Sequence, residues 1–523
     1  MKNLLIVFYF LGTFSANSQA PTILWQHNYG SPGTDQCRGL FPMPDGGFIA
    51  IGGANQNGGD VTGHHGINDV WTIRIDSSGN LLWQKCFGGT NAEAGDEIIL
   101  NSLNQIIILG ITTSNDGDVT GNHGGMDVWI VKADTAGNLI DQKCFGGSAN
   151  DFGTSLVQTT DGGYIISGIT RSDNGDVSGQ HGAEDAWLLK VDSLFNLEWQ
   201  HCYGGTSLDG FKKVIQTLDG NYLGTGYSYS TNGDITDHRG DTLYPDAWIV
   251  KADTIGNLMW QKSFGGSDDD FGEATIETAI NEFLFVGTTF SNDSDVTANH
   301  SSGWYCDIWL VKFDNTNGIE WEKCLGGNSS ENGIALYQGI DKNITIFGGA
   351  ASNNNGDVGA GHGSNDYWLL RTDSIGNVLW NKCFGGTTLD HAWEFSLIND
   401  TTYLLGGWSS STDGDITNNI GVEDYWLVKA SYTTATQLEE FNAEQMLLVY
   451  PSPATTYFNI DLTGYDDKTE ITICDIAGSI IYKTTTIANQ KVEINSSEFA
   501  EGIYLVQIQS ADFLTTQMLV VTK

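Results

Sequence analysis

The sequence predicts an all-β protein: a seven-bladed β-propeller followed by a small Ig-like β-sandwich. Three observations carry this prediction. An Asp-x-Trp element recurs seven times within residues 23–430, at intervals of 58 to 61 residues. Each repeat unit holds four short apolar runs separated by glycine-containing turns, which is typical of a propeller blade. The repeat stops at Ala430, and a shorter segment with a different strand pattern follows.

The third repeat unit shows the four expected strands most clearly. They cover residues 153–160, 164–170, 186–192 and 196–204. These runs are apolar on nearly every residue rather than on alternate residues, so we expect both faces of each blade to be buried. The structural runner-up is a β-solenoid, whose repeats are usually shorter than these.

The two ends of the repeat array predict how the ring closes. A lone strand of the fourth type, residues 23–30, precedes the first unit. The last unit stops after its third strand, residues 424–430. We therefore expect residues 23–30 to complete the last blade of a propeller domain spanning residues 21–430. Such closure removes the exposed sheet edges that invite aggregation.

The N-terminal segment is typical of a secretory signal peptide. Lys2 supplies the positive charge, residues 4–14 form an apolar run, and Ser18-Gln19-Ala20 is a small-residue cleavage site. The apolar run is too short for a membrane span. We expect residues 1–20 to be removed and the mature, exported chain to begin near Pro21.

The composition limits the classes of partner. The net charge of −41 disfavours nucleic acid and anionic membranes, because both require clustered Lys and Arg. Five of the eight cysteines occupy one repeated position: Cys86, Cys144, Cys202, Cys324 and Cys383. Equivalent positions in separate units lie too far apart to form disulfides, so we expect small buried core residues there. Cys37 and Cys306 lie outside this position, and a disulfide involving them stays open.

Three acidic positions recur in every unit. The first holds Asp60, Asp118, Asp176, Asp234, Asp295, Asp357 and Asp415; the second Asp69, Asp127, Asp185, Asp246, Asp307, Asp366 and Asp424; the third Asp35, Glu93, Asp151, Asp209, Asp270, Glu331 and Asp390. A histidine accompanies them in the first six units: His65, His123, His181, His238, His300 and His362. Blade topology places all four positions on one face of the ring.

These repeated positions allow three interpretations. In the first, the carboxylates and histidines form hydrogen bonds that shape the loops. In the second, paired carboxylates hold Ca²⁺, with Asp116, Asp118 and Asp127 as ligands in the second unit and their equivalents elsewhere. In the third, they contact a ligand directly. The uniformity of the units favours the first interpretation, and the EF-hand calcium pattern is absent.

Two units break the pattern and are better candidates for ligand binding. The long loops of the fourth and fifth units add Tyr244, Trp304 and Tyr305 to the same face, with Arg239 nearby. Exposed aromatic side chains beside polar groups can stack on sugar rings or hold a peptide. The alternative is that these aromatic side chains pack on each other and cover a blade edge.

No catalytic motif is found. The sequence has no GxSxG, HExxH or P-loop element, and its five arginines are scattered over different units. We therefore expect no enzyme and no bound cofactor apart from the calcium alternative. The abundance of acidic residues keeps a carboxylate pair for glycoside hydrolysis as an alternative.

After a polar linker, residues 431–445, the final segment predicts short strands and turns. Residues 446–523 resemble the type A sorting domain of the bacterial type IX secretion system. The matching features are Tyr450-Pro451-x-Pro453, Asp475-Ile476-x-Gly478, residues 502–506 (GIYLV) and the terminal lysine. Ser452 and Ser479 stand where this family usually has Asn and often Arg. The repeats are also similar to tandem propeller repeats of exported Bacteroidota proteins.

This resemblance implies export across the outer membrane by the type IX machinery and cleavage by its sortase. The passenger is then released or anchored to surface lipopolysaccharide. Taken together, the sequence predicts a secreted or surface-attached propeller that binds a glycan or protein ligand. The alternatives are a polysaccharide-active enzyme on the same scaffold and a structural surface component.

Overall fold

The computed structural model describes residues 20–240, 243–300, 304–316, 318–433, 448–462, 468–475, 480–487, 491–509 and 514–523. The chain divides into two compact units, residues 1–434 and 435–523, and each is described by itself. The predicted signal peptide up to residue 19, most of the predicted linker, and Ile476, Gly478 and Ser479 lie outside the described residues. No helix in the described ranges is long and apolar enough to cross a bilayer.

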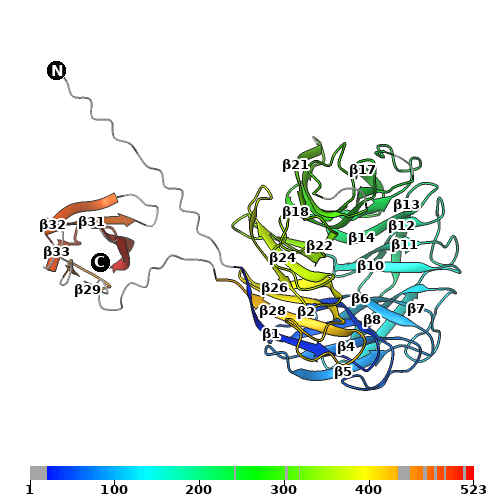
Figure 1. Ribbon diagram of the computed structural model, residues 1–523. Coiled ribbons are helices and arrows are strands. Elements are labelled where there is room, and N and C mark those ends of the chain that lie inside the picture. Colours follow the sequence, from blue (N-terminus) through cyan, green and yellow to red (C-terminus); the bar gives the residue numbers. More distant parts are fainter. Residues whose placement is uncertain are drawn as a thin grey trace. The chain divides into compact units, whose positions relative to one another are not determined.

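The first unit consists of seven four-stranded antiparallel sheets arranged in a ring (Figure 1). The strands of the first three blades are β2 (Asp35–Pro42), β3 (Phe48–Ala54), β4 (Asp69–Ile75), β5 (Leu81–Phe87), β6 (Glu93–Leu100), β7 (Ile106–Thr112), β8 (Asp127–Ala133), β9 (Leu139–Phe145), β10 (Asp151–Gln158), β11 (Tyr164–Thr170), β12 (Asp185–Val191) and β13 (Leu197–Tyr203).

The next three blades repeat this order. Their strands are β14 (Asp209–Gln216), β15 (Tyr222–Ser228), β16 (Asp246–Ala252), β17 (Leu258–Phe264), β18 (Asp270–Ala279), β19 (Glu282–Thr289), β20 (Asp307–Asp314), β21 (Gly318–Leu325), β22 (Glu331–Gln338), β23 (Ile344–Ala350), β24 (Asp366–Thr372) and β25 (Val378–Phe384). The last blade contains β26 (Asp390–Asn399), β27 (Thr402–Ser409), β28 (Asp424–Ser431) and β1 (Thr22–Tyr29). The first strand of each blade contacts the first strands of both neighbouring blades, so these strands surround the centre.

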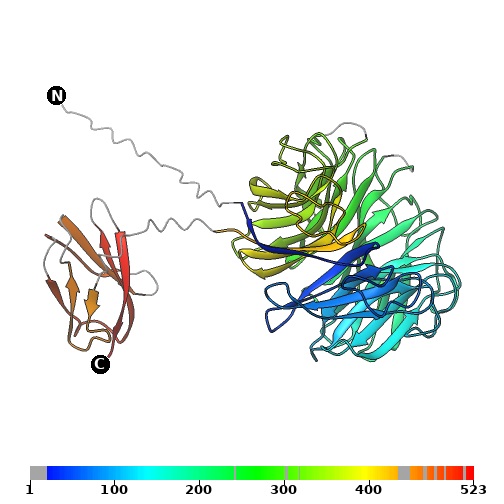
Figure 2. The same ribbon diagram turned by 60° about the horizontal axis from the view of Figure 1, so that its bottom comes forward.

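The ring closes as the sequence predicts. β1 pairs with β28 in antiparallel register, with Gln26 opposite Val428 and Asn28 opposite Trp426. Figures 1 and 2 show blue β1 lying beside yellow β28. The seven-bladed propeller is thus confirmed, with the N-terminal strand completing the last blade.

A buried tryptophan organises each blade. The seven tryptophans of the Asp-x-Trp elements are fully buried: Trp71, Trp129, Trp187, Trp248, Trp309, Trp368 and Trp426. A buried indole N–H requires an acceptor, and the fourth strand supplies it: Trp129 Nε1 donates to Gln142 Oε1 at 2.8 Å. Gln142 Nε2 in turn donates to Thr120 Oγ1 at 2.5 Å, which ties the long loop to the outer strand.

The closing strand forms the same network in the last blade. Trp426 Nε1 donates to Gln26 Oε1 at 3.0 Å, and Gln26 Nε2 donates to Thr417 Oγ1 at 2.6 Å. These bonds join residues about four hundred positions apart in the chain. The last blade is therefore closed by the same Trp–Gln–Thr network that the first, second and fourth blades contain.

The five cysteines of the repeated position are buried and unpaired, as expected from their spacing. Cys37 and Cys306 are also buried and unpaired. Burial raises the pKa of Cys86 and Cys144 to about 12, so these thiols are protonated and unreactive at neutral pH.

The repeated carboxylates hold the loops of the blade junctions. At the junction of the second and third blades, Asp151 accepts hydrogen bonds from the Gly147 amide at 2.8 Å and from the Thr170 hydroxyl at 2.5 Å. Asp127 accepts from the His123 amide at 2.9 Å and lies 2.7 Å from His123 Nδ1. His123 Nε2 lies 3.7 Å from Asp176 of the next blade. The second and third acidic positions are buried rather than displayed on the ring face.

These junctions bury carboxyl groups beside each other. Burial raises the pKa of Asp246 to about 8 and of Asp270 to about 7, and the two carboxylates repel each other. Burial also raises the pKa of Asp35 and Asp390 to about 6. A glycine is required next to each pair: a Cβ at Gly265 would lie 2.6 Å from oxygens of both Asp246 and Asp270.

The second unit is a small β-sandwich. One sheet contains β29 (Leu448–Tyr450), β30 (Tyr457–Asp461) and β33 (Lys491–Asn495). The other contains, in spatial order, β32 (Ile480–Ile487), β31 (Lys468–Asp475), β34 (Gly502–Gln509) and β35 (Leu514–Val521). Phe458, Ile473 and Val506 pack in the core between them. Ser452 Oγ accepts a hydrogen bond from the Val520 amide at 3.1 Å, so the serine is built into this fold.

The ring closure can be tested with a matched pair of variants. Gln26→Ala and Gln84→Ala each remove the acceptor of a buried indole N–H, in the closing blade and in the first blade respectively. We expect both to lower the free energy of unfolding by a similar amount, about 1 to 3 kcal/mol. Urea unfolding followed by tryptophan fluorescence measures the change. If Gln84→Ala lowered the free energy of unfolding and Gln26→Ala left it unchanged, the pairing of β1 with β28 would be contradicted.

The buried carboxyl groups predict a pH dependence of stability. A carboxyl group whose pKa is higher in the folded than in the unfolded protein stabilises the fold while it is protonated, and this contribution is lost as the pH rises through the folded pKa. For Asp246 the relevant window runs from about pH 4 to about pH 8. We expect Tm to fall by a few degrees between pH 5 and pH 8.

The variant Asp246→Asn isolates this effect. The amide oxygen can still accept the bond from the Arg239 amide but carries no charge. We expect the fall in Tm between pH 5 and pH 8 to be smaller in Asp246→Asn than in the unmodified protein, measured by differential scanning calorimetry. Equal slopes for the two proteins would show that Asp246 does not titrate in this range.

Candidate functional site

The central channel of the propeller holds a cavity of about 740 Å³. It is lined mainly by the first strands of the blades, β2, β6, β10, β14, β18, β22 and β26. Besides a histidine, its lining includes seven acidic or basic side chains: Arg38, Asp96, Glu97, Lys212, Lys213, Glu273 and Glu394. Concave sites that combine apolar walls with a few charged groups are the usual places for ligands.

A β-bulge in every inner strand explains why the channel is so densely charged. The register between the first and second strand shifts at the fourth residue of each blade, for example between Gly95 and Glu97 and between Phe211 and Lys213. Consecutive side chains of a regular strand point to opposite faces, but a bulge changes this alternation. As a result, both Asp96 and Glu97 line the channel, and so do both Lys212 and Lys213.

Lys213 connects three blades across the channel. Its Nζ lies 2.8 Å from Glu97 Oε1 and 3.5 Å from Glu394 Oε2. The other oxygen of Glu97 accepts a hydrogen bond from the Leu156 amide at 2.9 Å. Burial alone would lower the pKa of Lys213, but the two carboxylates raise it, so the ammonium is charged over the whole physiological range.

A second ion pair lies beside an aromatic cluster. Arg38 NH1 lies 2.9 Å from Asp96 Oδ1, and the guanidinium stands 5.1 Å from the ring centre of Trp393. The ring centres of Trp393 and Trp408 lie 5.4 Å apart, and Trp408 stacks on His391 with 4.2 Å between the ring centres. A guanidinium over an indole is a favourable cation–π contact, so this side of the channel is both aromatic and charged.

Three carboxyl groups of the channel are electrostatically perturbed. Burial raises the pKa of Glu394, and Lys213 offsets part of this increase. Burial likewise raises the pKa of Asp96 against the charge of Arg38, and of Glu273 against the charge of Lys212. Perturbed carboxyl groups gathered in a cavity are characteristic of functional sites.

Sequence reasoning missed the channel, although the sequence contains a signal for it. The loop positions are nearly identical in all units, whereas the fourth and fifth residues of the inner strands differ from unit to unit. They read Arg38-Gly39, Asp96-Glu97, Thr154-Ser155, Lys212-Lys213, Glu273-Ala274, Ile334-Ala335 and Trp393-Glu394. Comparing the units for their differences along the first strand would have found these residues.

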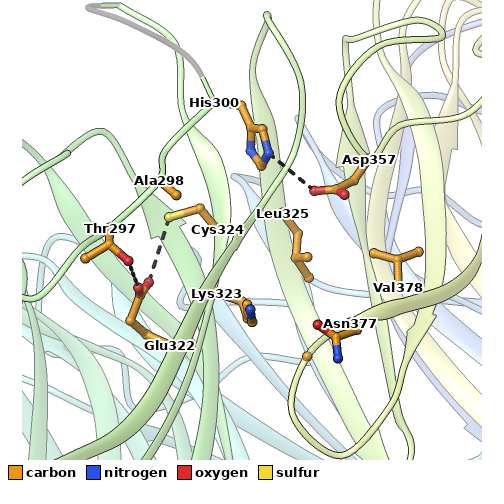
Figure 3. Close-up of a pocket in the computed structure, with 11 residues that line it drawn as sticks. Thr297, Ala298, His300, Glu322, Lys323, Cys324, Leu325, Asp357, Asn377 and Val378 are labelled. Carbon is orange, nitrogen blue, oxygen red and sulfur yellow. Dashed lines mark hydrogen bonds and ion pairs between the residues drawn. The ribbon is translucent and has the colours of Figure 1, made fainter.

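A smaller groove of about 400 Å³ lies between the fifth and sixth blades (Figure 3). Glu322 replaces the glutamine found in most other blades, accepts the Trp309 indole N–H at 3.0 Å and bonds Thr297. Across the groove, His300 Nε2 lies 3.7 Å from Asp357 Oδ2, as Figure 3 shows. These contacts belong to the repeated blade-junction network, so the groove is a variation of the scaffold.

The predicted ligand-binding residues lie away from the channel lining. Trp304 is 92 % exposed, Tyr305 48 % and Tyr244 39 %. Arg239 is paired with Asp295 at 3.0 Å, and its amide donates to Asp246. The structure does not place these four residues among those that line the central channel. Their role in ligand binding stays a prediction.

The predicted calcium ligands form protein hydrogen bonds. Asp116 accepts bonds from the amide and the hydroxyl of Thr90, at 2.8 and 2.9 Å. Asp118 accepts from the Gly88 amide at 3.2 Å. Within the described ranges, no three His, Cys, Asp or Glu side chains are placed to share a metal ion. Calcium binding at Asp116, Asp118, Asp127 and their equivalents stays a prediction.

Comparison with known proteins gives one curated relative and several solved structures. The chain is 22 % identical over 470 residues to the Regulatory protein FlaEY of Caulobacter vibrioides; the match covers 81 % of this chain and 46 % of that protein. The chain thus spans about half the length of this relative.

Two of the similar structures are the Pan2 WD40 domain of Neurospora crassa and an α-L-arabinofuranosidase of Fusarium graminearum. The first has a TM-score of 0.43 at 9 % identity and covers 79 % of this chain and 96 % of that one. The second has a TM-score of 0.37 at 7 % identity and covers 80 % and 99 %.

Residues 448–522 match the protein-family model described as Secretion system C-terminal sorting domain. This match covers the β-sandwich and confirms the resemblance inferred from the Tyr450-Pro451 and GIYLV elements. The C-terminal segment is a type IX sorting domain, and it marks the propeller for export and for secretion or attachment at the cell surface.

Proposed function

We propose that this chain is an exported binding module whose propeller holds its ligand in the central channel. The observation that carries the proposal is the asymmetry of the channel. Seven nearly identical blades present different side chains at their innermost positions, and these include three ion pairs, a tryptophan and an apolar wall. A purely structural ring would need no such variation, because the junction networks and the apolar clusters between neighbouring blades already hold the ring together.

The channel suits one compact polar unit of the glycan or protein ligand that the sequence suggests. Glu97, Glu394 and Lys213 can exchange hydrogen bonds with hydroxyl or amide groups, and Trp393 offers an aromatic surface. Charged groups that are already fixed in ion pairs need little reorganisation when a ligand binds. The exposed Trp304 and Tyr244 on the long loops form the alternative binding surface.

A polysaccharide-active enzyme is the second candidate function. The raised pKa of Glu394 and Asp96 favours it, because a general acid must hold its proton near the working pH. Release of reducing ends from extracellular polysaccharides, tested with Glu394→Gln as the inactive control, separates an enzyme from a binding module.

The location of the site is tested by binding to glycan and peptide arrays. We expect Trp393→Ala and Glu394→Gln to weaken the binding of any captured ligand by about tenfold or more, since each removes a channel contact. The double variant Trp304→Ala/Tyr244→Ala serves as the matched loop control, and calorimetric Tm values check that all variants fold. Binding that survives the channel changes but is lost in the loop variant would move the site to the long loops.

A further inference from the structure

Two charged side chains in the channel stand apart from the others. Arg38 is paired with Asp96, and Lys213 with both Glu97 and Glu394. Lys212 and Glu273 also line the cavity, but within the described structure neither forms a hydrogen bond or an ion pair. Their charges are opposite, and a partly buried charge is costly without a partner.

Lys212 and Glu273 are neighbours in the ring. Each is the fourth residue of its inner strand, in β14 and β18, and these strands lie side by side. The charge of Lys212 lowers the pKa of Glu273 against the effect of burial, so the two groups sense each other without forming an ion pair. The cavity lining therefore carries a positive group on β14 and a negative group on the adjacent β18.

The next inner strand places an apolar surface beside this pair. Ile334 and Ala335 occupy the same positions in β22 and line the cavity together with Ile276 of β18. These side chains give the channel an apolar surface on β18 and β22. A ligand that spans this region meets an ammonium, a carboxylate and an aliphatic wall.

We propose that the channel selects a small zwitterion with an apolar side group, of the kind found in apolar α-amino acids and short peptides. Its carboxylate faces Lys212, its ammonium faces Glu273, and its apolar group packs on Ile334 and Ala335. Charge-assisted hydrogen bonds of this kind are about twice as strong as neutral ones. The inference rests on the proposed function, because it names the ligand class of the same channel.

The test uses the full chain and three probes: a zwitterion and two derivatives that each lack one of its two charges. L-leucine carries both charges, N-acetyl-L-leucine lacks the ammonium, and L-leucinamide lacks the carboxylate. Isothermal titration calorimetry should show L-leucine binding about tenfold to a hundredfold more tightly than either derivative. The dipeptide Leu-Leu, run in parallel, distinguishes a free amino acid from a short peptide as the source of the zwitterion.

Two variants assign each charge to its partner. Lys212→Met should remove the preference for L-leucine over L-leucinamide, and Glu273→Gln should remove the preference over N-acetyl-L-leucine. Lys143→Met and Asp141→Asn, on the exposed outer strand β9, are the matched charge controls and should leave all affinities unchanged. Calorimetric Tm values confirm that the four variants fold.

The possible failures can be distinguished. Equal binding of the three probes, or no binding of any zwitterion while Trp393→Ala still abolishes capture of another ligand, would overturn this inference and leave the proposed function standing. If no ligand of any class responds to changes in the channel, the proposed function itself fails.

Discussion

The pairing of β1 with β28 is the contact on which the rest of the propeller depends. Each blade buries its two faces against its neighbours, so the ring has no free face only when every blade is complete. Without β1, the last blade would expose an unpaired strand edge and leave the indole N–H of Trp426 without an acceptor. Gln26 and Thr417 form the same hydrogen bond as Gln142 and Thr120. The blade assembled from the two ends of the repeat array is therefore held in the same way as a blade made from one continuous segment.

This closed scaffold separates the residues that hold the blades together from the residues that differ from blade to blade. The junction carboxylates, the buried tryptophans and the loop glycines recur in nearly every unit because each unit must meet its neighbours in the same way. The innermost residues face the channel and are released from that requirement. The blades can therefore differ at these positions while the rest of each unit stays the same. Examples are the contacts of Lys213 with Glu97 and Glu394, and the unpaired side chains of Lys212 and Glu273.

Most of the fold follows from the sequence because its determinants repeat. The spacing of Trp71, Trp129 and their equivalents predicts the blades, and the orphan strand at residues 23–30 predicts the closure. The interpretation of the acidic positions as loop hydrogen-bonding groups agrees with the contacts of Asp127 and Asp151. The channel was not predicted, because regular alternation places only one of Asp96 and Glu97 inward and the bulge that turns both inward depends on the backbone. The loop of Trp304 differs from its equivalents in length and is easily recognised in the sequence. The inner strands keep the same length in the sequence motif and differ only in residue type, so their differences are harder to recognise.

The split last blade also sets an order of events in time. Ribosomes make β1 first and β28 after all the other strands of the ring, so the propeller cannot be completed until its whole repeat array has been synthesised. The contact that completes the ring spans the longest separation in the propeller, and contacts of this kind are slow to form. The sorting domain follows β28 in the chain, so it emerges only after the last strand of the ring. Only a chain that already contains every strand of the propeller therefore carries the sorting domain.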